Sequence, residues 1–123
     1  EYVQFPASLA VISRGSFSSC INLANVSLPE ELTKIETTAF WGTAFREITI
    51  PATVTEIEDM AFTDCKELKK VTCKGNTPPT IGAYTFDNGY KTGRRLYCPT
   101  TSSGYNPLWQ DYFESITFID MTR

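Results

Sequence analysis

The chain has 123 residues, with 14 acidic and 11 basic side chains and no histidine. Its length and ordinary apolar fraction indicate one folded domain, and no apolar run approaches the roughly 18 residues of a membrane span. The net charge of −3 disfavours nucleic acids and anionic membranes as partners, and the absence of histidine excludes Ser-His or Cys-His catalytic pairs and histidine metal sites.

The first expected element is a strand at residues 2–5, whose apolar pattern returns along the chain. Pairs of apolar residues separated by one residue occur at positions 3 and 5, 26 and 28, 48 and 50, 71 and 73, and 96 and 98. This alternation predicts short strands. A proline, which cannot donate to a ladder, follows four of the five pairs, at Pro6, Pro29, Pro51 and Pro99. Lys74 stands where the fifth would be.

Behind each strand, two further apolar rows keep the same period. Isoleucine recurs at positions 12, 35, 57 and 81 and phenylalanine at 17, 40, 62 and 86, in steps of 23, 22 and 24 residues. The isoleucines predict a second extended segment, and the phenylalanines a tight helical turn that buries its ring. A period of about 20 to 29 residues is typical of leucine-rich-repeat solenoids. We therefore expect one β-rich domain of short parallel strands over residues 1–123, with repeats at about 3–25, 26–47, 48–70 and 71–95.

The second repeat is one residue short. Five positions separate Phe40 from Phe45, whereas six separate Phe17 from Leu23. Trp41 lies in this shortened turn, and it either covers the gap or forms an exposed aromatic anchor for a partner.

The C-terminal residues 96–123 depart from the period and predict a cap. Asn106 is the expected N-cap of a helix with Pro107 at its first position, and residues 108, 109, 112 and 113 would form its apolar face. A last strand should follow, with Phe113, Ile116 and Phe118 in the inward slots. At the other end, the strand at residues 2–5 leaves an open edge, which predicts that the chain is the C-terminal fragment of a longer protein.

The repeated phrase can be compared with a known family. The segment SLPEELTKIETTAFWGTAFREITIPATVTEIEDMAFTDCKELKKV resembles the BspA-type leucine-rich repeats of bacterial surface proteins. The segments TPPTIGAYTF and LYCPTTSSGYNPLWQDYFESI are similar to the terminal part of many members. Lys74, Cys98 and the shortened turn depart from the pattern. The resemblance implies an extracellular or surface-anchored, non-catalytic adhesion module without a cofactor, whose partners include host matrix or cell-surface proteins.

We expect the charged clusters to be exposed to solvent rather than to form catalytic or metal-binding sites. Glu56 and Glu58 flank the inward Ile57, and together with Asp59 we interpret them as a solvated face, since no second type of metal ligand accompanies them. The one local basic cluster contains Lys91, Arg94 and Arg95. We expect it to be a solvated hairpin tip, with a contact to an anion or an acidic partner as the alternative.

The four cysteines form no C-x-x-C pair. Cys20 and Cys65 occupy the same slot two repeats apart, with Thr43 between them, and are too distant to bond. Cys73 and Cys98 should be neighbours, but stacked positions hold Cβ atoms about 4.8 Å apart, beyond the usual disulfide range. Buried free thiols are the expectation, and a Cys73–Cys98 bridge stays open.

The side chains between the inward rows would form an outward ladder across the stacked strands. It consists of Gln4, Asn25, Ser27, Glu47, Thr49, Lys70, Thr72, Arg95, Tyr97 and Thr117. Its polarity suits recognition of a protein over an extended face, as solenoids commonly provide, although solubility alone would also explain it. The leading hypothesis is therefore an adhesion or protein-binding module, and the alternative is a structural stalk or spacer that presents another domain. The sequence shows no nucleophile paired with a base, no metal-binding cluster and no phosphate-binding loop, so an enzyme is disfavoured.

Overall fold

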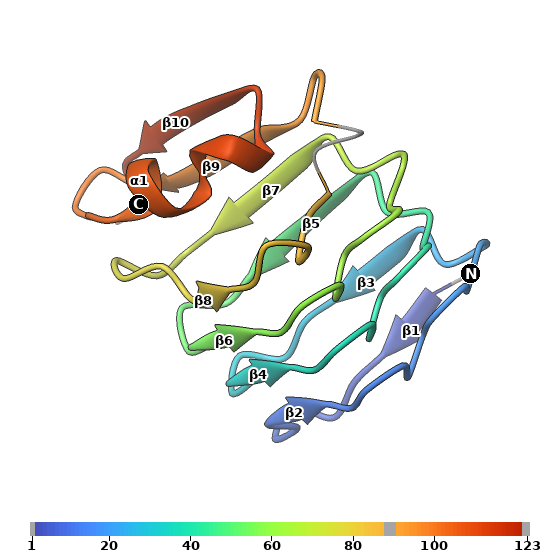
Figure 1. The fold of residues 1–123 in the computed structure, drawn as a ribbon. Helices are drawn as coiled ribbons and strands as arrows, with labels where there is room; N and C mark the ends of the chain where they lie inside the picture. The colour runs from blue at the N-terminus through green and yellow to red at the C-terminus, as the bar shows by residue number, and fades with distance from the viewer. Residues whose placement is uncertain (1, 88–90, 122–123) are drawn as a thin grey trace.

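The computed structural model describes residues 2–87 and 91–121, and the chain winds as a β-solenoid with two walls of short parallel strands (Figure 1). The first wall contains β1 (Tyr2–Gln4), β3 (Asn25–Ser27), β5 (Glu47–Ile50), β7 (Lys70–Cys73), β9 (Arg95–Pro99) and β10 (Ser115–Ile119). The second wall contains β2 (Val11–Ile12), β4 (Lys34–Ile35), β6 (Glu56–Ile57) and β8 (Thr80–Ile81). The C-terminal part holds α1 (Tyr105–Trp109) and the 3-10 helix η2 (Gln110–Tyr112).

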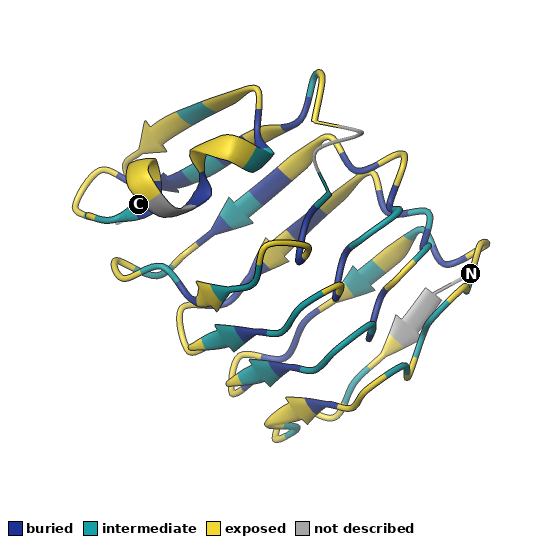
Figure 2. Ribbon diagram, viewed as in Figure 1, coloured by how far each residue is buried: buried dark blue, intermediate teal, exposed yellow. Residues whose placement is uncertain are grey.

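The register of the strands confirms the apolar rows expected from the repeat. In the first wall, Ile48 pairs with Val71, which pairs with Leu96, and Leu96 pairs with Ile116. In the second wall, the four isoleucines at positions 12, 35, 57 and 81 are paired in series. Since β-strand side chains alternate between faces, two inward rows of the first wall and one of the second direct their apolar side chains into the space between the walls. Figure 2 shows buried positions alternating with exposed ones along β5, and with exposed and half-buried ones along β7.

The phenylalanine row forms the centre of the core. The rings of Phe17, Phe40, Phe62 and Phe86 stack in series, with centroids 5.5, 5.5 and 5.3 Å apart and interplanar angles of 15° or less. The last three of these side chains are fully buried. The backbone that carries them forms hydrogen-bonded turns rather than helices, and it is bonded to the next coil, as in the bond from the Phe40 amide to the Ala61 carbonyl at 2.9 Å.

Each of the first three turns contains two residues with left-handed backbone, placed two positions before and two positions after the phenylalanine. The φ angles are +65° at Gly15, +58° at Thr38 and +61° at Met60 in the first set, and +61° at Ser19, +73° at Gly42 and +62° at Asp64 in the second. Only glycine adopts this conformation at little steric cost, yet four of the six positions carry a side chain. The turns are therefore locally strained and are held by the stacking of one coil on the next.

The C-terminal cap follows the prediction in outline and corrects it in detail. The expected N-cap at Asn106 is wrong, because α1 begins at Tyr105 and its N-cap is Gly104, with φ +100°. The buried Tyr105, whose hydroxyl donates to the Gly75 carbonyl at 2.8 Å, fixes this start. Trp109 and Phe113 are buried and extend the core, with ring centroids 5.4 and 5.3 Å from that of Phe86.

The last strand pairs with β9 as expected, and Phe118 lies opposite Cys98. Phe118 thus takes the predicted slot, although its side chain remains 40% exposed. The exposure of Phe118 follows from its position. In the described part of the chain β10 is the outer strand of its sheet and has a neighbouring strand on one side only.

Candidate protein-binding face

The outward side chains of the first wall form what we call the strand face. The residues proposed for it from sequence all come from the first-wall strands: Gln4, Asn25, Glu47, Thr49, Lys70, Thr72, Arg95 and Tyr97. Six of them are exposed, and Thr72 and Tyr97 are half-buried. Strand register places Glu47, Lys70 and Arg95 in one row, and Thr49, Thr72, Tyr97 and Thr117 in a second. The structure therefore gathers residues about 23 positions apart in sequence into two adjacent polar rows.

The strand face has an uneven distribution of charge. Lys70 and Arg95 lie side by side on β7 and β9, and the Lys70 ammonium sits 5.3 Å from the centroid of the Tyr97 ring. A cation at this distance is attracted by the electron density of the ring face. Glu47 pairs in register with Lys70 on the other side. The face thus changes from acidic at β5 to basic at β7 and β9.

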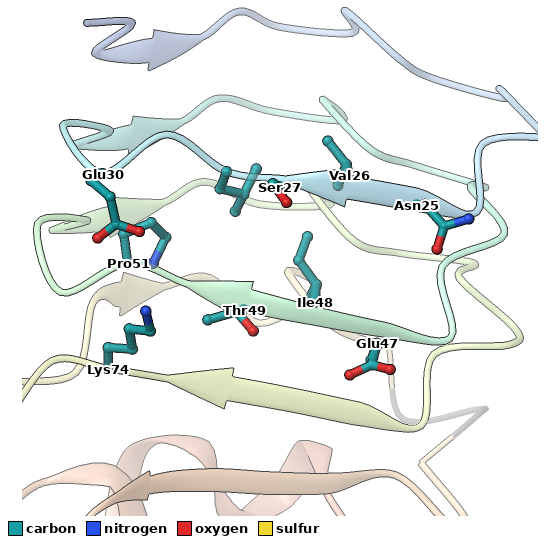
Figure 3. A pocket seen from close by; sticks show the side chains of 10 residues that line it. Asn25, Val26, Ser27, Glu30, Glu47, Ile48, Thr49, Pro51 and Lys74 are labelled. Atoms are coloured by element: carbon teal, nitrogen blue, oxygen red, sulfur yellow. The ribbon is translucent and has the colours of Figure 1, made fainter. Parts of the chain in front are cut away.

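The strand face is also interrupted. The described first-wall strands form a two-stranded sheet, β1 with β3, and a separate four-stranded sheet in the order β10, β9, β7, β5. The expected continuous stack is therefore wrong between β3 and β5, where a groove of about 470 Å³ opens (Figure 3). The polar side chains that line it are Asn25, Ser27, Glu30, Glu47, Thr49 and Lys74.

The carboxylates of the second wall join neighbouring turns. Glu58 accepts bonds from the Thr37 amide at 3.0 Å and the Thr37 hydroxyl at 3.1 Å, and Lys34 lies 3.2 Å from it. The bond from the Thr37 amide, followed by the bond from Lys34, holds the pKa of Glu58 below its ordinary value. Asp59 accepts from the Tyr84 amide at 2.8 Å. Glu56 also lies 3.7 Å from the Lys34 ammonium. The interpretation of this cluster as a merely solvated face is thus incomplete, because all three of its members contact a neighbouring coil.

The prediction that the whole basic cluster is a solvated hairpin tip is wrong for Arg94. Its side chain is fully buried, whereas Lys91 and Arg95 are exposed. The guanidinium donates to the carbonyls of Leu68 at 3.2 Å, Asp87 at 3.0 Å and Tyr112 at 3.5 Å. Arg94 therefore ties the last repeat to the cap, and no periodic signal in the sequence marks it.

The cysteines are free thiols, and Cys65, Cys73 and Cys98 are buried. The Cys65 sulfur lies 3.3 Å from the hydroxyl of Thr43, which confirms the slot shared by consecutive repeats. Burial raises the pKa of all three buried thiols, so they remain protonated at neutral pH and are poor nucleophiles. Within residues 2–87 and 91–121, no three His, Cys, Asp or Glu side chains are grouped to hold a metal ion.

Comparisons with known proteins agree with the repeat. A family model described as BspA type Leucine rich repeat region matches residues 1–103, in six copies. A search of curated proteins gave no match. None of the helices in the described part of the chain has the length and apolar character to span a membrane.

Proposed function

This chain belongs to the BspA-type leucine-rich repeat family, and we propose that it is a non-catalytic protein-binding module that mediates adhesion at a bacterial surface or after secretion. The family is typically a protein-interaction fold, and its members are generally bacterial surface or secreted proteins. Host matrix and cell-surface proteins are the class of partner that we propose for this member.

The observation that carries the proposal is the ladder of polar side chains in register on the strand face. Short paired strands hold Glu47, Lys70 and Arg95 at fixed spacing, so a partner would bind without ordering a flexible loop. Tyr97 adds an aromatic surface under Lys70. Tyrosine and arginine are the residue types that most often contribute strongly to the binding free energy of interfaces.

Two charge reversals test this assignment. The domain is added to an immobilised panel of extracellular-matrix proteins, and bound protein is measured for the wild type, Arg95→Glu and Arg14→Glu. Both arginines are exposed, but Arg95 lies on the strand face and Arg14 follows β2 in the second wall. We expect Arg95→Glu to weaken binding at least tenfold and Arg14→Glu to change it less than twofold.

Equal binding by both variants would show that the strand face is not the site. If the wild-type domain captures nothing while a longer protein that contains it does, the domain acts as a stalk or spacer instead.

A further inference from the structure

The strand β10 is an edge strand of the first wall, since it pairs with β9 on one side and no strand of the described chain lies on its other side (Figure 1). An edge strand carries unpaired amides and carbonyls that can pair with another chain, and proteins commonly protect it with proline, charged side chains or a very short strand. The five residues of β10, SITFI, include neither proline nor a charged residue. By contrast, the outer strand β8 of the second wall has only two residues.

The hydrogen bonds to β9 show which backbone groups of β10 remain open. The Thr100 amide donates to the Ile119 carbonyl at 2.9 Å. In a parallel ladder, successive residues of a strand direct their backbone groups alternately to its two sides. The backbone groups of Ile119 and Thr117 therefore point toward β9, whereas Ile116 and Phe118 direct theirs to the open side. This edge thus offers amides and carbonyls at the regular spacing of a strand.

The inward side chains of β10 leave apolar surface beside the open edge. Ile116 pairs with Leu96 and Phe118 with Cys98, so both lie in the inward rows of the first wall. Leu96 and Cys98 are fully buried, whereas Ile116 is half-buried and Phe118 is 40% exposed. A further strand at this edge would cover both side chains of β10, as β10 itself covers those of β9.

The charges at the two ends of β10 indicate which strand fits the edge. Glu114 and Asp120 flank the strand, and both are exposed. If a second copy of the chain added its own β10 in the antiparallel direction with all five residues paired, Glu114 of each copy would lie opposite Asp120 of the other. Like charges directly opposite each other in a sheet are destabilising, whereas opposite charges are favourable. A strand with lysine or arginine at both ends is therefore a better occupant than a second copy.

We propose that the open edge of β10 binds a β-strand of a protein partner, in which basic residues at both ends flank two apolar inward side chains. The partner strand extends the first wall through main-chain hydrogen bonds, and its alternate side chains provide the specificity. This inference rests on the proposed protein-binding function, and it adds a contact at the edge of the first wall to the contacts on the strand face.

A designed peptide tests the edge directly. The capped heptapeptide Lys-Thr-Val-Thr-Val-Thr-Lys places valine beside the two inward side chains and lysine beside the two carboxylates, in either direction of pairing. It is titrated into the isotopically labelled domain, and the dissociation constant is obtained from the NMR shifts of the Ile116 and Phe118 amides. We expect a control peptide with glutamate in place of both lysines to bind at least tenfold more weakly.

N-methylation of the peptide shows whether its main chain pairs with β10. In a strand that pairs at one edge only, every second amide donates to that edge. These are the third and fifth amides of an antiparallel peptide, or the fourth and sixth of a parallel one. We expect methylation of one of these pairs of amides to weaken binding at least tenfold, and methylation of the other pair to change it less than threefold.

Two variants of the domain locate the binding to β10. Phe118→Lys places a charge in the open inward slot, whereas Ile21→Lys changes an exposed apolar side chain in the turn before β3. We expect Phe118→Lys to weaken peptide binding at least tenfold and Ile21→Lys to change it less than twofold. Should Phe118→Lys unfold, the methylated peptides still test the edge on the unaltered domain. In the free domain, the amides of Ile116 and Phe118 should exchange with solvent faster than that of Thr117, which points toward β9.

Absence of peptide binding, equal binding of the lysine and glutamate peptides, equal effects of the two methylated pairs or equal binding by the two domain variants would overturn the inference. Dimerisation of the wild type in sedimentation equilibrium that Phe118→Lys abolishes would assign the edge to a second copy instead. The matrix-protein panel keeps the two proposals separate. A matrix protein lost with Arg95→Glu but retained by Phe118→Lys would refute the role of the edge and leave the strand face standing. Peptide binding at β10 by a domain that captures no matrix protein would do the reverse.

Discussion

The central prediction concerns Phe62, the third ring of the phenylalanine row. Its side chain is fully buried, and its ring stacks on Phe40 at 5.5 Å and on Phe86 at 5.3 Å. Phe62→Ala removes about 100 Å³ of side chain, and a cavity of that size costs about 2.4 kcal/mol at about 24 cal/mol per Å³. The lost transfer of apolar surface adds about 2 kcal/mol. We therefore expect the free energy of unfolding to fall by about 4 kcal/mol.

Urea unfolding followed by circular dichroism measures this loss. With an m-value of about 2 kcal/mol per molar urea, the midpoint should fall by about 2 M. Phe118→Ala is the matched control, because Phe118 occupies an apolar slot but is 40% exposed on the outer strand β10. Its loss should stay below about 1 kcal/mol. If Phe62→Ala does not fold, Phe62→Leu should still destabilise the domain, by about 1 kcal/mol, because it loses the stacked ring but keeps most of the volume.

A loss below about 1 kcal/mol in Phe62→Ala, or a loss no greater than that in Phe118→Ala, would refute the reasoning. Either result would mean that the coils are held mainly by the two strand walls, and that the rings fill space without setting the stability of the stack.

Three further predictions address the turns and the cap. Arg94→Met should lower the free energy of unfolding by about 2–4 kcal/mol, because it leaves three carbonyls, one of them in a buried bond, without their donor. Arg95→Met should change it by less than about 0.5 kcal/mol, and equal effects of the two variants in denaturant unfolding would contradict the buried role of Arg94. Met60→Gly should stabilise the domain by about 0.5 kcal/mol, since φ is +61° at this position and glycine adopts this backbone without strain. Met60→Ala should give no gain. A loss of stability in the glycine variant would argue against strain at this turn. The lowered pKa of Glu58 means that the unfolded chain takes up this proton at a higher pH than the folded domain does, so the stabilisation is complete at neutral pH and is lost as the pH falls below about 4.5. The melting temperature of the wild type should therefore fall more steeply between pH 5 and pH 3 than that of Glu58→Gln, and parallel curves would show that the bond from Thr37 does not stabilise the fold.

Most of the fold could be predicted from the sequence because each apolar position of the repeat recurs in several coils. A single isoleucine has no assigned place, but four in steps of 22 to 24 residues can only lie together if the chain coils, and β2, β4, β6 and β8 pair them as expected. The same argument placed the phenylalanine row in the core. The candidate residues Glu47, Lys70 and Arg95 were found by the same alternation, since each lies beside an inward residue of its strand.

The features that sequence reasoning missed depend on contacts between distant segments that occur once. Arg94 belongs to a residue type that is almost never fully buried, and its carbonyl partners lie 26 residues before it and 18 after it, so composition placed it in solvent. The cap begins at Gly104 instead of Asn106 because Tyr105 reaches the carbonyl of Gly75, 30 residues away. Neither contact repeats, so no period could reveal it.

The shortened turn could be recognised in the sequence, but its effect on the structure could not, because the length of a turn does not say which part of the coil the missing residue displaces. The core does not absorb it, since Phe17 and Phe40 stack at the same 5.5 Å as Phe40 and Phe62. The second wall does not absorb it either, because β2, β4 and β6 remain paired in series. In the first wall β5 also keeps its pairing with β7, and among the described strands of this wall a ladder is absent only between β3 and β5. Packing and recognition are thus separable in this chain, and substitutions of exposed residues on the strand face should alter binding while the rings that stabilise the coil stay in place.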